Sequence, residues 1–365
     1  MVRCWMCNAE IKEENVSKEH IFLNAIGGKL RSNSLLCKTC NQNLGDSIDY
    51  ELAEQLNIFT NLLDIRRDDG SLPPPIHTTS ESGVDYKLLH GGKPELDKPS
   101  IRMDGRNIHI IARSTQEANK LMRGYKRKYP EIDVAKIAAH MEHKKRYLNE
   151  YLGIECELGG KARLSVCKTA INFYILKGGD RRCISHLIPY VQGCHSDDVV
   201  GFFYNHEVIQ KNPGQIIHAI ILIGNPDTHI LYAYVEFFNA VRYIILLNDH
   251  YDAAEISSSY FFDVLEGQEV KLNYWINLTK EQIKNLLEIG NIPYQKVKEA
   301  FSCALEIITN RQQEKHLHEM CNIALEKSLM KYPEGEIITP EMGNELCEAL
   351  MEELMPWLFS VIKDE

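Results

Sequence analysis

Two short cysteine pairs, Cys4-Trp5-Met6-Cys7 and Cys37-Lys38-Thr39-Cys40, stand 29 residues apart near the N-terminus of this 365-residue chain. Each pair places two thiolates on one tight turn, and two such turns supply the four sulfur ligands of a tetrahedral zinc site. A redox pair or a chance spacing would explain either pair alone. Together they predict one structural Zn²⁺ held by all four thiolates, which would stabilise a segment too short to fold on its own apolar core.

The residues between and after the cysteine pairs indicate a β-hairpin followed by a helix. Glu19-His20 lies in the first expected strand, and Gly27-Gly28 provides a turn before the second. Asn41 comes directly after the last cysteine. Apolar residues then recur every four positions, which predicts a helix that begins near the second pair: Leu44, Ile48, Leu52 and Leu56.

In this order the segment resembles the HNH endonucleases, a family of ββα-metal nucleases. The positions that carry the resemblance are Cys4, Cys7, Glu19-His20, Gly27-Gly28, Cys37, Cys40-Asn41, Gly45 and Asp49. They cover about residues 1–56, and the Glu-His pair alone would be uninformative. The resemblance implies metal-dependent hydrolysis of DNA phosphodiester bonds that leaves 5′-phosphate and 3′-hydroxyl ends. RNA remains open as a substrate.

The family pattern also implies a role for individual residues. His20 would be the general base, since an imidazole is mostly neutral at physiological pH. Glu19 and Asn41 match the ligands of a catalytic divalent ion, Mg²⁺ or Mn²⁺. The family's middle asparagine falls on Ser32, and Asn33 follows one residue later. A role for Asn33 would therefore depend on a shifted position.

A second interpretation keeps the zinc site but not the catalysis. In this alternative, Glu19 and His20 are surface residues of a zinc scaffold that binds nucleic acid or assembles with another protein. The two interpretations differ in whether the chain cleaves DNA and whether cleavage needs His20.

The remainder of the chain predicts an α+β fold in which the zinc-bound module precedes a mixed domain with an antiparallel sheet and a helical C-terminus. The expected segments are an HNH module at 1–62, a linker at 63–80, a hairpin with basic helices at 81–155, a sheet domain at 156–278 and helices at 279–365. The hairpin is predicted around Asp104-Gly105, and helices are predicted at 114–130, 133–152 and 166–176. Strands are predicted at 199–204, 216–223, 230–238 and 241–247, with 216–223 central because both its faces are apolar.

Polar residues on the helix predicted at 166–176 include Lys168, Asn172 and Tyr174. We interpret them as a packing or contact surface, because the sequence assigns them no chemistry.

Charge is unevenly distributed along the chain. The formal net charge is −10, from 41 Lys and Arg against 51 Asp and Glu. Residues 102–146 contain 12 basic and 5 acidic residues, whereas residues 313–365 contain 4 basic and 12 acidic residues. The basic segment is a candidate for phosphate contacts with nucleic acid, although such a charge run is more often a solvated helix surface. Its candidate binding residues are Lys120, Arg123, Lys126, Arg127, Lys128, Lys144, Lys145 and Arg146.

The compartment follows from the cysteines and the apolar runs. We expect a cytoplasmic protein with reduced thiols, since the N-terminus lacks a signal-peptide pattern and no apolar stretch is long enough to cross a membrane. The acidic C-terminal helices are candidates for docking a partner protein or a second copy of the chain. HNH modules with such long appendages resemble restriction and phage-defence effectors or mobile-element proteins.

Overall fold

The structure is a computed structural model, in which residues 2–104, 107–130, 148, 150–194, 198–288, 293–333 and 335–362 are described. The chain forms two compact units. Unit 1 consists of Met1–Pro74 and Cys156–Ile308, and unit 2 consists of Pro75–Glu155 and Thr309–Glu365. The α+β class is confirmed, since helices accompany antiparallel sheets in the described parts of the chain.

Unit 1 contains an antiparallel six-stranded sheet in the order β14-β13-β10-β11-β12-β9. The strand β10 is central, as predicted. The four predicted strands are present, and β13 and β14 extend the sheet beyond β10. Three consecutive serines, Ser257–Ser259, dilute the apolar pattern of β13 and explain why this strand was not predicted. The strand bounds are β9 Val200–Phe202, β10 Ile217–Asn225, β11 Ile230–Phe237, β12 Val241–Asn248, β13 Ile256–Asp263 and β14 Gln268–Val270.

Both faces of this sheet are covered. Ile220 and Leu222 of β10 belong to a core shared with the N-terminal module, whereas Ala219 and Ile221 belong to a separate core on the other face. Successive side chains of a strand point to opposite faces, so β10 carries apolar residues on both faces. The helix α8 (Lys280–Leu287) begins at a capping box formed by Thr279 and Gln282, and it contributes to the second core.

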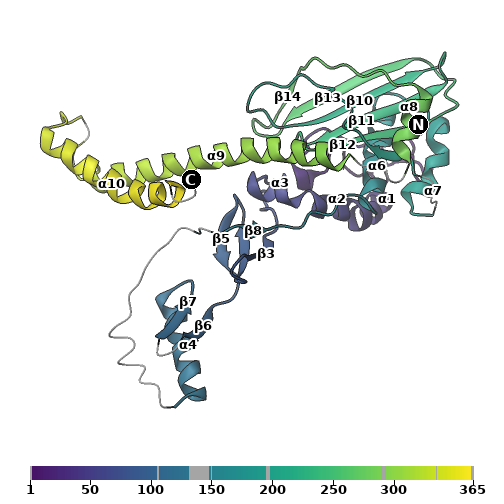
Figure 1. Cartoon of the computed structure of the whole chain (residues 1–365). Coiled ribbons are helices and arrows are strands. Elements are labelled where there is room, and N and C mark those ends of the chain that lie inside the picture. Colours follow the sequence, from purple (N-terminus) through teal and green to yellow (C-terminus); the bar gives the residue numbers. More distant parts are fainter. Residues whose placement is uncertain are drawn as a thin grey trace. The chain divides into compact units, whose positions relative to one another are not determined.

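The N-terminal module is part of unit 1 and packs against the first core. Figure 1 shows α6 between the sheet and the helices α1 and α2. Phe22 stacks on His218 of β10, with 5.2 Å between ring centroids, and Phe59 stacks on Phe238 at 5.1 Å. The bounds are β1 Glu19–His20, β2 Arg31–Ser32, α1 Lys38–Leu44, α2 Tyr50–Gln55, α3 Asn57–Leu62, α6 Ala162–Leu176 and α7 Ile188–Val191, with 3₁₀ helices at Asn24–Ile26 and Arg181–Leu187.

His218 joins the sheet to the module. Its side chain is fully buried, and Nε2 donates to the carbonyl oxygen of Ile26 at 2.8 Å. Burial lowers the pKa of His218 to about 4, against a small opposing effect of this hydrogen bond. The imidazole is therefore neutral in the folded protein at every pH above that value.

We expect acid to destabilise unit 1 through His218. Between pH 6.5 and 4 the unfolded chain binds a proton at this position and the folded chain does not, so the free energy of unfolding falls as the pH is lowered. The expected loss is about 3 kcal/mol. The free energy of unfolding, measured with denaturant across this pH range, should depend less steeply on pH for His218→Gln than for wild type. Glutamine keeps a hydrogen-bond donor but does not bind a proton in this range. Equal slopes for both proteins would contradict the assignment.

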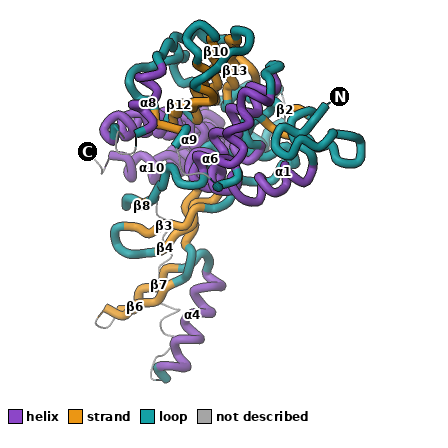
Figure 2. Tube along the Cα trace, turned by 90° about the vertical axis from the view of Figure 1, so that its right-hand side faces the viewer, coloured by secondary structure: helices purple, strands orange, loops and turns teal. Residues whose placement is uncertain are grey.

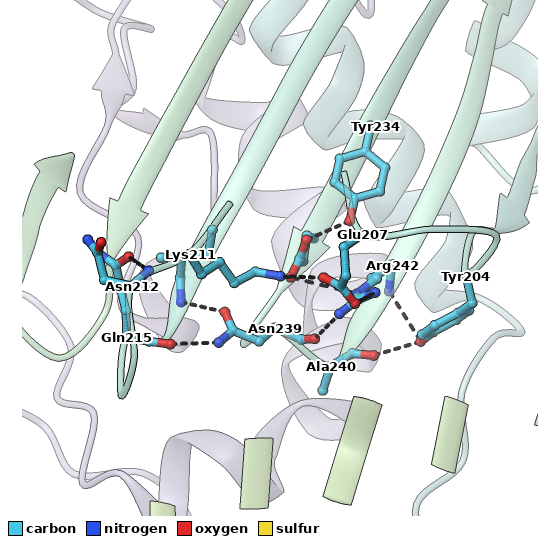
Figure 3. Close-up of polar contacts among 11 residues, drawn as sticks. Tyr204, Glu207, Lys211, Asn212, Gln215, Tyr234, Asn239, Ala240 and Arg242 are labelled. Atoms are coloured by element: carbon cyan, nitrogen blue, oxygen red, sulfur yellow. Dashed lines mark hydrogen bonds and ion pairs between the residues drawn. The ribbon is translucent and has the colours of Figure 1, made fainter. Parts of the chain in front are cut away.

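A charged cluster fills the sheet face opposite the module (Figure 3). Glu236 is completely buried and lies 2.8 Å from Lys211 Nζ, while the Arg242 guanidinium donates to Glu207 at 2.6 Å. The Tyr234 hydroxyl donates to Glu236 at 2.5 Å. Each buried charge has a partner of opposite sign, as burial requires. These contacts hold the segment that contains Glu207 and Lys211 against strands β11 and β12 of the sheet.

Unit 2 begins with small sheets. The hairpin is confirmed as β6 and β7, and Figure 2 shows it beside α4. Ser114 caps α4, since its hydroxyl accepts from the backbone N–H of Glu117 at 3.2 Å. The helix predicted at 133–152 falls mostly outside the described residues. The bounds are β3 Ile76–Ser80, β4 Asp85–Leu89, β5 Lys93–Leu96, β6 Ser100–Asp104, β7 Asn107–Ile111, α4 Thr115–Lys128 and β8 Leu152–Gly153.

The C-terminal region is helical, as predicted. Its helices are α9 (Tyr294–Ser328), whose first part belongs to unit 1, and α10 (Pro340–Ile362). Thr339 caps α10 through a hydrogen bond from the backbone N–H of Met342. The described helices include none with the length and apolarity needed to cross a membrane.

The compact units differ from the five segments expected from the order of the chain. Residues 63–74, expected to be a linker, pack in unit 1, where the Asn61 side chain donates to the Pro74 carbonyl oxygen at 2.9 Å. The strand β3 follows almost at once and occupies the rest of the expected linker. A discontinuous unit of this kind arises from packing between residues far apart in the sequence. The local composition of the chain does not predict such packing.

Candidate active site

The four cysteines of the two pairs converge on one point. The sulfur atoms of Cys4, Cys7, Cys37 and Cys40 all lie within 4.8 Å of one another. Zinc–sulfur bonds of about 2.3 Å place the corners of a tetrahedron about 3.8 Å apart. The Cys7–Cys37 sulfur distance is 3.7 Å, so this pair has the spacing of a tetrahedral zinc site.

The first cysteine turn is held from a distant part of the sequence. The Trp5 indole N–H donates to Oδ1 of Asn172 on α6 at 2.8 Å. The Arg181 guanidinium donates to the carbonyl oxygens of Trp5 at 2.6 Å and Met6 at 3.3 Å. The first cysteine turn therefore depends on residues that follow it by more than 150 positions.

The two glycines between the strands are needed for the turn. Gly27 has a φ of +89°, and a Cβ on Gly28 would lie 1.9 Å from the Phe22 carbonyl oxygen. The tight turn lets β1 and β2 pair in antiparallel register, with Glu19 opposite Ser32 and His20 opposite Arg31.

Three of the four predicted catalytic residues border one pocket of about 430 Å³ in unit 1. Glu19, His20 and Asn41 all line it, together with Asp49 and Lys168. Neighbouring residues of a strand normally point to opposite faces, but β1 ends at His20, where the chain bends. The hairpin and the following helix therefore bring together three residues that span 22 positions of the sequence.

Lys168 of α6 lies at the bottom of this pocket between two carboxylates. Its Nζ is 2.5 Å from Glu19 Oε1 and 2.6 Å from Asp49 Oδ2. Burial disfavours the charge on Lys168, but Asp49 and Glu19 outweigh that effect and raise the pKa of the ammonium group. The ammonium group is therefore charged at neutral pH and neutralises part of the negative charge of the pocket.

Both carboxylates have further partners on α6. Asn172 Nδ2 donates to Glu19 Oε1 at 2.7 Å, and the Ser165 hydroxyl donates to Asp49 Oδ1 at 2.6 Å. A π-helical segment, Gly45–Asp49, interrupts the helical run between α1 and α2 and ends at Asp49. Such interruptions are common at functional sites.

His20 lies at the other side of the pocket. Its Nε2 is 3.2 Å from Asp68 Oδ2, and its side chain is 16% exposed. Burial lowers the pKa of His20, Arg31 and Lys29 lower it further, and Asp68 opposes them. His20 is accordingly neutral at physiological pH, which is the state that a general base needs.

The two asparagines differ in position. Asn41 Nδ2 donates to the Ser17 hydroxyl and to the Lys18 carbonyl oxygen, both at 3.3 Å, which leaves Oδ1 as its acceptor atom. Asn33 is exposed in the bend after β2 and is not part of the pocket lining. The geometry gathers Glu19, His20 and Asn41 and leaves Asn33 aside.

The basic residues belong to unit 2. On α4, Lys120, Arg123, Lys126, Arg127 and Lys128 are all exposed, as a surface for phosphate contacts requires. The other three candidates, Lys144, Lys145 and Arg146, lie outside the described residues.

Sequence reasoning missed Lys168, Asn172, Ser165 and Asp68 as members of the site. The sequence indicates a packing or contact surface for Lys168 and Asn172 and no role for Ser165, and it places Asp68 in a linker. A signal was available for Lys168, because a lysine in an otherwise apolar helix needs a buried carboxylate partner. For Asp68 the sequence carries no comparable signal.

Comparison with known proteins agrees with the geometry at the N-terminus. Residues 4–57 match the family of HNH endonucleases. No curated protein and no solved structure matches the chain. The matched segment contains the four cysteines, the Glu19-His20 pair, Asn41 and Asp49. Residues 4–57 of this chain therefore form an N-terminal domain of the HNH endonuclease family.

Proposed function

We propose that this protein is a metal-dependent HNH endonuclease that hydrolyses DNA phosphodiester bonds. The observation that carries the proposal is the convergence of Glu19, His20 and Asn41 on one pocket within the segment that matches the family. The chemistry needs a general base and a cation beside the phosphate. A histidine supplies the base, and glutamate and asparagine oxygens can hold the cation.

In the proposed reaction, His20 removes a proton from the attacking water. The Glu19 carboxylate and the Asn41 carbonyl oxygen would hold Mg²⁺ or Mn²⁺, hard cations that prefer oxygen ligands. When bound, the cation would stabilise negative charge on the phosphate and on the departing 3′ oxygen. Both contacts of Glu19 to α6 fall on Oε1, so Oε2 is the atom that would meet the cation.

Replacing His20 with Ala is expected to slow cleavage roughly a hundredfold to ten-thousandfold, because the attacking water loses its base. The measurement is nicking of supercoiled plasmid in Mg²⁺ or Mn²⁺, repeated with single-stranded DNA and RNA. His250→Ala is a matched control, since His250 is an exposed histidine of the same unit outside the pocket. Equal cleavage by wild type and His20→Ala would refute the assigned base.

A non-catalytic zinc scaffold that binds nucleic acid is the second candidate. The ion pair between Glu19 and Lys168 favours it, because an ammonium group already occupies one side of the carboxylate. Absence of cleavage by the wild-type protein on all three substrates, with either cation, would support this alternative.

Other parts of the chain suggest how substrate and partners are engaged. The exposed basic residues of α4 support contacts with nucleic-acid phosphates, which depend on charge and not on sequence. A partner or second copy docked on the acidic C-terminal helices, and a role in restriction or phage defence, are further proposals that follow from the length of chain attached to the HNH domain.

A further inference from the structure

Asp68 is held by three side chains of the hairpin that carries His20. Its Oδ2 atom lies 3.2 Å from His20 Nε2 and 3.1 Å from Arg31 Nη1. Its Oδ1 atom accepts from Lys29 Nζ at 2.7 Å. One carboxylate therefore meets two cations and the proposed catalytic imidazole at the same point.

The backbone fixes Asp68 in this place. Its N–H donates to Asn24 Oδ1 at 2.9 Å, and Asn24 lines the same pocket as His20. The surrounding turn is closed by Arg67 N–H, which donates to the Ser71 carbonyl oxygen at 3.1 Å. The next residue, Asp69, accepts from the Ser71 N–H and points elsewhere. Asp68 is thus presented to His20 by an anchored turn.

The charges around Asp68 exceed what is needed to orient an imidazole. Lys29 and Arg31 carry two positive charges, and among the described contacts Asp68 is the carboxylate that both of them meet. A carboxylate and a phosphodiester each carry one negative charge on two oxygens, and arginine and lysine recognise both. The three donors therefore form an anion site suited to a phosphate group.

We propose that His20, Lys29 and Arg31 bind a phosphodiester group of the nucleic acid, and that Asp68 occupies this site until the nucleic acid displaces it. The link to catalysis rests on the proposed nuclease function, whereas the anion site itself does not. Displacement of Asp68 would place the phosphate beside the imidazole that activates water. In the absence of nucleic acid, the Asp68 carboxylate stays in contact with the His20 imidazole.

The test compares Asp68→Asn with Asp69→Asn, which removes the same charge one residue away and outside the site. Binding of a short labelled DNA duplex is measured by fluorescence anisotropy at low salt in buffer without Mg²⁺ or Mn²⁺, so that hydrolysis plays no part and the four-cysteine site keeps its metal. Asp68→Asn is expected to bind roughly three- to fivefold more tightly than wild type, because an exposed ion pair no longer competes. Asp69→Asn should match wild type.

A further variant shows which residue is responsible for the tighter DNA binding of Asp68→Asn. Adding Arg31→Ala to Asp68→Asn should abolish the tighter binding if Arg31 meets the phosphate. Equal affinities for Asp68→Asn and Asp69→Asn would overturn the proposal. Unchanged binding with slower plasmid nicking by Asp68→Asn would show instead that Asp68 orients His20. Tighter binding by Asp68→Asn in a protein that cleaves nothing would leave the anion site standing and refute only the nuclease function.

Discussion

Replacing Cys37 with Ser is expected to remove the zinc ion and to lower the free energy of unfolding of unit 1 by on the order of 5 kcal/mol, because zinc binding is folding free energy in a site of this kind. Cys37 lies in the same core cluster as Trp5, Phe22 and the sheet. Loss of the metal would therefore disturb more than the two cysteine turns. Such a loss is comparable with the whole stability of a typical domain.

Zinc content and thermal unfolding test this expectation together. Wild type should carry close to one zinc per chain, and Cys37→Ser should carry much less and melt at a lower temperature. Cys303→Ser is the matched control, because Cys303 is exposed and lies outside the four-cysteine cluster. A Cys37→Ser protein that melts like wild type would contradict a stabilising metal.

Replacing Lys168 with Met is expected to lower the free energy of unfolding by about 3 to 5 kcal/mol. Methionine preserves the length and apolar character of the side chain, but Glu19 and Asp49 lose the ammonium group that they share. Two carboxylates would then face each other in a buried site without a cation, and that arrangement is costly. Denaturant unfolding at neutral pH measures the effect.

Two comparisons show whether the carboxylates are the cause. Lys161→Met changes the same residue type at an exposed position beside the start of α6 and should have little effect. Neutralising the partners as well, in a Glu19→Gln, Asp49→Asn and Lys168→Met variant, should recover much of the stability. If the triple variant were no more stable than Lys168→Met, the loss would reflect packing around the methionine.

The parts of the fold that local spacing determines were predictable. The four-cysteine cluster, the hairpin with Glu19-His20 and the helical run through Leu44, Ile48, Leu52 and Leu56 follow from short-range patterns, and all four of those apolar residues are buried. The central position of β10 was also predictable, since a strand that is covered on both sides carries apolar residues on both of its faces.

The parts that depend on distant packing were not predictable. Lys168 belongs to the pocket because α6 packs on the HNH domain, and Asp68 reaches His20 because of one turn anchored to Asn24. Periodicity describes which face of an element is apolar, but not which element covers it. Hence the sequence indicated the type of site and only part of its membership.

The contacts of α6 have a consequence for how the protein is made. Asn172 bonds to Trp5 across 167 positions and to Glu19 across 153 positions, and Arg181 bonds to Trp5 across 176 positions. During synthesis the N-terminal residues leave the ribosome long before α6 exists. The nascent HNH domain therefore lacks the helix that fixes its acidic pocket, and the centre is completed only after the chain has extended beyond Arg181.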